Sequence, residues 1–119
     1  MAFRLNSWSV KWVITALQTI TPKHQDLQQI TIHIPYYLTV AKVFADVRRA
    51  IGEAGYGQWL ELDRLFVQVW ESRSIRPKAV VCAMQVKEKE DMRDCIGRLL
   101  PETTKGGIIG FIDRPYEPK

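Results

Sequence analysis

The sequence has few cysteines, no long hydrophobic run and only a mild excess of one charge. Its 119 residues include two cysteines, too few for a disulfide scaffold and typical of a reducing compartment. No apolar run reaches the roughly 18 residues of a membrane-spanning helix. The first residues lack the apolar centre of a signal peptide, and the last carry no prenylation or retention signal. We therefore expect an intracellular protein, cytoplasmic or nuclear, with no membrane association.

Length and composition predict one globular domain. The chain is 46% hydrophobic and 25% charged, close to the average of soluble domains, and no low-complexity linker divides it. We expect a single domain over residues 1–119 with an ordered core at about 7–113. The net charge of +4, from 17 basic and 13 acidic residues, is spread along the chain, so nucleic acid is not the expected partner.

The hydrophobic period changes between that of helices and that of strands. Helical spacing is found over residues 8–20, 39–54, 58–72 and 88–100. Strand patterns are found over residues 27–34, 78–86 and 108–112. Between the second and third helices, Gly55-Tyr56-Gly57 predicts a break. The order α-β-α-α-β-α-β predicts an α/β fold with a small, mainly parallel three-stranded sheet, because each helix carries the chain back across the sheet.

Two stretches, residues 12–32 and 92–112, each consist of a helix, a polar turn and a strand rich in isoleucine. Repeated helix–strand units that bury their faces against neighbours are typical of solenoids. The edges of so small a sheet expose unpaired backbone groups. We expect the chain to cover these edges, to form a homo-oligomer through them, or to belong to a longer array as a fragment.

Four segments of the chain resemble a known family: residues 27–37, 57–65, 70–78 and 99–102. They resemble the C-terminal part of fungal F-box and leucine-rich-repeat-like proteins, which are expanded in mushroom-forming fungi, and the resemblance covers about Ser7 to Asp113. It implies an irregular leucine-rich-repeat-like array that recognises a partner protein. An F-box does not fit before Ser7, so recruitment of a ubiquitin ligase is not implied.

The sequence offers little that would carry chemistry. Its soft metal ligands form no short-spaced pair; they are His24, His33, Cys82 and Cys95. There is no Gly-x-Ser-x-Gly elbow and no glycine-rich phosphate loop after a strand. Glu61 and Asp63 stand two residues apart on a predicted helix, so they should point to different sides. We predict no metal, no cofactor and no enzymatic activity.

The predicted binding residues lie at the rim of the sheet and on one strand face. Three basic residues precede or begin the second predicted strand, and a histidine and two tyrosines lie on or just after the first. They are Arg73, Arg76, Lys78, His33, Tyr36 and Tyr37. With Thr31, His33 lies opposite the isoleucines of its strand, where loops and strand faces on a rigid scaffold often carry function.

Three hypotheses follow from these residues. The leading one is a non-enzymatic protein-interaction module of leucine-rich-repeat-like type, possibly a truncated substrate-recognition region of the F-box family. An alternative is a small enzyme of unrecognised type, in which His33 acts as a base beside Tyr36 or Tyr37. Another is weak nucleic-acid binding through the basic residues of positions 73–78.

Overall fold

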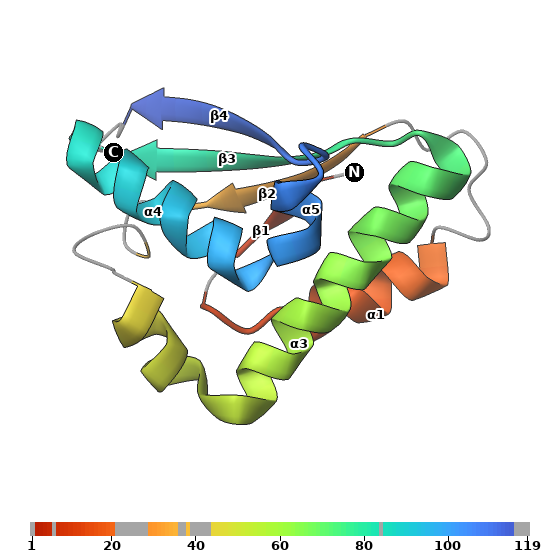
Figure 1. Cartoon of the computed structure of the whole chain (residues 1–119), viewed down its shortest axis with the longest axis horizontal. Helices are drawn as coiled ribbons and strands as arrows, with labels where there is room; N and C mark the ends of the chain where they lie inside the picture. Colours follow the sequence, from red (N-terminus) through yellow and green to blue (C-terminus); the bar gives the residue numbers. More distant parts are fainter. Residues whose placement is uncertain are drawn as a thin grey trace.

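The computed structural model describes residues 2–5, 7–20, 29–35, 38, 44–83 and 85–115. Strands and helices alternate along the chain (Figure 1). In order they are β1 (Ala2–Arg4), α1 (Lys11–Ile20), β2 (Ile30–Ile34), α3 (Phe44–Arg73), β3 (Pro77–Ala83), α4 (Val86–Leu99), α5 (Pro101–Lys105) and β4 (Gly110–Pro115).

The strands form one sheet in the order β1-β2-β3-β4, and each neighbouring pair is parallel. The α/β class and the parallel sheet are thus confirmed, but the three-strand count is wrong because β1 precedes the first helix. With only three residues, β1 is too short to show a period of two. One row of the register runs across the whole sheet, from Arg4 through His33 and Val80 to Ile112.

All the described helices lie on one side of this sheet (Figure 1). Every connection steps to the next strand in the same direction, and crossovers of one hand then place their helices on the same face. The burial of β2 agrees: Ile30, Ile32 and Ile34 are buried towards the helices, whereas Thr31 and His33 between them are half-buried. We call the other side the open face. Its positions with described side chains are Ala2, Arg4, Thr31, His33, Lys78, Val80, Cys82, Gly110 and Ile112.

The core fills the layer between the sheet and the helices. Its largest fully buried side chains include Trp59 and Phe66 of α3. The indole Nε1 of Trp59 donates a hydrogen bond to the Trp8 carbonyl at 2.8 Å, which joins α3 to the segment before α1. Phe3 and Leu5 are also buried, so the core begins ahead of Ser7.

Most predicted helices are present with shifted ends. The first begins at Lys11 rather than at residue 8. The last, α4, confirms the helix predicted over 88–100, beginning two residues earlier and ending one residue earlier. Gln85 and Glu88 form a reciprocal capping box there. The middle break is different from the expected one: α3 is interrupted at Gly52, with φ 68° and ψ −174°, and continues as helix through residues 55–57. The first part of the predicted helix 39–54, residues 39–43, lies outside the described residues.

The strand ends also differ from the expected ones, and one short helix was missed. The second predicted strand is Pro77–Ala83, and the third runs two to three residues later than expected, over Gly110–Pro115. The helix α5 has five residues with proline in its first turn. That is too few for a hydrophobic period to be recognised.

Candidate interaction surface

The open face is basic and apolar. Arg4 is exposed, and His33 and Lys78 are half-buried. None of the nine open-face positions defined above is Asp or Glu. The acid of β4, Asp113, pairs in register with the buried Val81 and so lies on the helix side, where it binds Arg93 of α4 at 2.6 Å.

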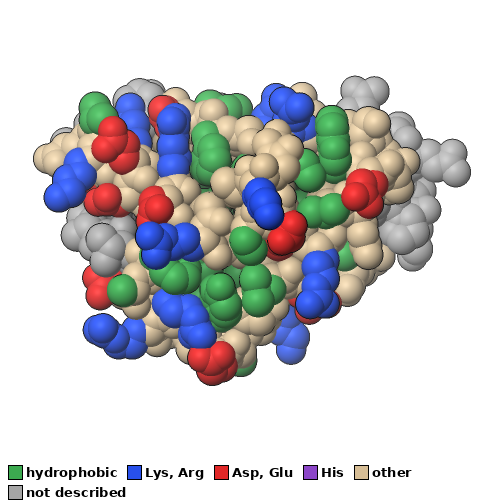
Figure 2. Space-filling view, viewed as in Figure 1, with side chains coloured by type: hydrophobic (Ala, Val, Ile, Leu, Met, Phe, Trp, Pro, Cys, Tyr) green, Lys and Arg blue, Asp and Glu red, His purple; other side chains and the backbone are tan. Residues whose placement is uncertain are grey.

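The helix side has a different charge pattern. Figure 2 shows Lys and Arg side chains standing among Asp and Glu side chains over the helices. Three arginines there are held by acids with N–O distances of 2.5, 2.6 and 3.2 Å: Arg48–Glu53, Arg93–Asp113 and Arg98–Asp94. No acid stands at a described position of the open face, so Arg4 and Lys78 have no acidic neighbour there.

An apolar patch adjoins these cations. Ile112 is 41% exposed on the edge strand β4, while its register neighbour Val80 is 2% exposed in the middle of the sheet. Cys82 follows two residues later on the same face and is half-buried. Because Val80 is buried, the apolar surface that a partner would meet here is that of Ile112, the diagonal neighbour of Lys78, and of the half-buried Cys82.

The register brings together two residues that the sequence predicted separately. Lys78 pairs with Thr31, and His33 pairs with Val80, so His33 and Lys78 are diagonal neighbours on the open face. A β-carbon placed at Gly110 would lie 3.7 Å from Cγ of Lys78. The lysine stem therefore lies beside β4, at an ordinary van der Waals distance from residue 110.

Sequence reasoning missed Arg4, which pairs with His33 in register, and it missed Ile112. The available signal at Arg4 was the alternation of Ala2-Phe3-Arg4-Leu5, in which Phe3 and Leu5 are buried and the other two exposed. Four residues are a weak basis for a strand prediction.

The two predicted arginines lie on a different part of the surface from Lys78. Arg73 ends α3, and Arg76 is exposed with its guanidinium carbon 5.4 Å from the centre of the Trp70 ring. Ser74 between them has φ 57°, which turns the chain from α3 towards β3. Arg76 thus packs against Trp70 of α3, whereas Lys78 lies on the open face. These two cations therefore do not converge. Tyr36, Tyr37 and His24 lie outside the described residues.

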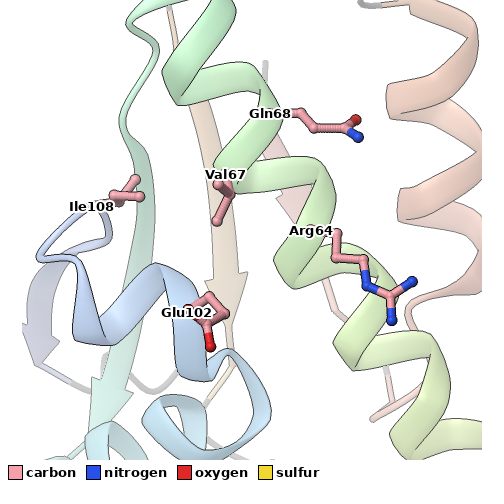
Figure 3. A pocket seen from close by; sticks show the side chains of 5 residues that line it. All are labelled: Arg64, Val67, Gln68, Glu102 and Ile108. Atoms are coloured by element: carbon pink, nitrogen blue, oxygen red, sulfur yellow. The ribbon is translucent and has the colours of Figure 1, made fainter.

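A groove of about 320 Å³ lies between α3 and α5. Its lining residues are Arg64, Val67, Gln68, Glu102 and Ile108 (Figure 3). Val67 and Ile108 form its apolar part, whereas the Arg64 and Gln68 side chains extend to the other side of α3 (Figure 3). The lining brings together no acid, base and nucleophile of the kind that a catalytic centre needs.

The part of the chain that the structure describes contains no group of three side chains able to hold a metal ion. Both cysteines are free thiols. Burial, with a smaller effect of the Asp94 carboxylate, raises the pKa of the Cys95 thiol from 9.0 to about 12. Such a thiol stays protonated at neutral pH and behaves as a small apolar side chain.

This shift predicts a specific loss of stability at high pH. The unfolded chain releases the Cys95 proton above about pH 9, whereas the folded chain keeps it up to about pH 12. Between these values the free energy of unfolding should fall by about 1.4 kcal/mol per pH unit from this group alone. Urea unfolding of Cys95→Ala should lack this component, and Cys82→Ser should retain it. Equal pH slopes for the wild type and Cys95→Ala would contradict the prediction.

No helix in the described ranges is both long enough and apolar enough to cross a membrane. Comparisons with protein-family models, curated proteins and solved structures found no significant match to this chain.

Proposed function

We propose that this chain is a non-enzymatic protein-interaction module of leucine-rich-repeat-like type, and that its open face receives the partner. The support from the fold is the order of the sheet, in which each strand lies beside the next one in the sequence. Stacked strand–helix units of this kind place strands along one face and helices along the other. A role as a truncated substrate-recognition region of the F-box family is the finer form of the same proposal.

The observation that carries the proposal is the composition of the open face. Two permanent cations, Arg4 and Lys78, lie there with the half-buried His33 and the exposed Ile112, and no acid stands among the described positions. Interfaces typically combine an apolar contact with charges that select the partner. The predicted site residues His33 and Lys78 belong to this surface, and Arg73 and Arg76 lie at the approach to β3.

Affinity capture with matched charge reversals tests the proposal. The open-face variant is Arg4→Glu with Lys78→Glu, and the control is Arg49→Glu with Lys87→Glu, two exposed cations on α3 and α4. Both variants change the net charge equally. We expect quantitative mass spectrometry to find proteins that the wild type and the control retain and that the open-face variant loses. Identical protein sets for the two variants, or no specific protein with the wild type, would contradict the proposal.

A further inference from the structure

The open face also indicates the chemistry of its partner. We propose that it binds an acidic polypeptide segment that carries two carboxylates and an aliphatic or aromatic side chain. This inference rests on the proposed function and specifies the occupant of the same surface.

The first argument is charge. Arg4 and Lys78 have no acid at any neighbouring described position of the open face. Opposite charge on a partner would satisfy Arg4 and Lys78, whereas a basic partner would be repelled. The occupant is therefore acidic.

The second argument is spacing. Arg4 lies on β1 and Lys78 on β3, with β2 between them, and the register offsets them by two residues along the strands. Neighbouring strands are about 4.8 Å apart and residues rise about 3.3 Å, so the two α-carbons are separated by roughly 12 Å. An extended segment covers that distance in three to four residues. Two acids at this separation would reach both cations.

The third argument distinguishes a polypeptide from a nucleic acid. The exposed Ile112 is the diagonal neighbour of Lys78, and the half-buried Cys82 lies on the same face; burial of aliphatic surface contributes about 25 cal/mol per Å². A nucleic-acid backbone has no matching apolar group, and its binding depends on neutralising several phosphates. Two permanent cations beside an aliphatic patch fit an acidic, partly apolar peptide better.

The test uses the intact chain and an array of nine-residue peptides. Each peptide has two Asp or Glu residues three to four positions apart and one Leu or Phe. A second set replaces the acids by Asn or Gln, a third replaces the apolar residue by Ser, and single-stranded DNA of nine nucleotides serves as the polyanion. We expect the acidic–apolar set to bind at least about tenfold more tightly than the other three.

Variants of the chain link this binding to the open face. Arg4→Glu with Lys78→Glu should abolish binding, Ile112→Ser should weaken it several-fold, and the Arg49→Glu, Lys87→Glu control should leave it unchanged. The milder Arg4→Gln with Lys78→Gln replaces the reversal if circular dichroism shows that the reversal unfolds the chain. Sedimentation of the wild type and the variants reveals any self-association.

Several outcomes would overturn the inference. These are equal binding of the amide set, equal binding of DNA, no binding of any peptide, or a dimer that the open-face variant dissociates, since a second copy would then occupy the face. Partners lost on open-face reversal in affinity capture, without preference for the acidic set, would leave the proposed function standing and refute only the acidic occupant.

Discussion

Replacing Asp63 by alanine is expected to lower the free energy of unfolding by about 2–4 kcal/mol. Asp63 lies on α3, is 2% exposed and faces the start of α5. Its carboxylate accepts hydrogen bonds from the Thr103 amide at 2.9 Å, the Thr103 hydroxyl at 2.6 Å and the Glu102 amide at 3.1 Å. Alanine leaves the Glu102 and Thr103 amides without their acceptor, whereas the Thr103 hydroxyl keeps the main-chain carbonyl of residue 63 at 3.3 Å. The two unsatisfied amides are the source of the loss.

Two further substitutions separate this effect from a general cost of mutating α3. Glu61→Ala removes an exposed carboxylate from the same helix and should change stability by less than about 0.5 kcal/mol. Asp63→Asn keeps the shape but offers one acceptor oxygen instead of two, so its loss should be intermediate. Urea unfolding measures all three. If Asp63→Ala and Glu61→Ala lower the free energy of unfolding by amounts within 1 kcal/mol of each other, on the scale of ordinary surface changes, the hydrogen bonds of the Asp63 carboxylate to α5 contribute little.

The hydrogen bonds of the Asp63 carboxylate to the start of α5 also connect the core to the open face. The Thr103 carbonyl accepts the Ile108 amide at 2.9 Å, and the turn at Gly107, with φ 66°, then leads into β4. Because α3 holds α5 and α5 leads into β4, the position of Ile112 depends on a carboxylate on the opposite side of the sheet.

Asp63 shows why part of the structure escaped prediction. The apolar stripe of α3 includes Trp59, Leu62 and Phe66, and Asp63 stands four residues after the first and three before the last. That spacing places it on the buried side, but a carboxylate is normally exposed, so the sequence predicts only that Glu61 and Asp63 point to different sides of the helix. Its partners lie about 40 residues away, beyond any local pattern.

The sequence was more informative where a pattern repeats. The alternation of Ile30, Ile32 and Ile34 predicted β2 and the orientation of His33, and the strand pattern over residues 78–86 predicted β3. Strand register was not predictable, because no hairpin turn links these strands and fixes their alignment. The open face depends on that register, so its two predicted members were found without their neighbours Arg4 and Ile112.

Replacing Gly52 by alanine is expected to destabilise the fold by about 1–3 kcal/mol. Gly52 has φ 68° and ψ −174°, a backbone region that is essentially restricted to glycine. No atom lies within 4 Å of a β-carbon placed there, so the cost comes from backbone strain and not from a clash. This conformation lets the residues before Gly52 turn back. The ring centroids of Phe44 and Tyr56 are then 6.3 Å apart, and the guanidinium carbon of Arg48 lies 4.3 Å from the centroid of the Tyr56 ring.

Gly57→Ala is the matched control because it should change stability in the opposite direction. Gly57 is exposed within the helix, and a β-carbon there also meets nothing within 4 Å. Alanine in a helix interior is favoured over glycine by about 0.5–1 kcal/mol. Urea midpoints should therefore fall for Gly52→Ala and rise for Gly57→Ala. If both rise, residue 52 adopts ordinary helical angles in solution, and α3 is continuous there instead of turning back at Gly52.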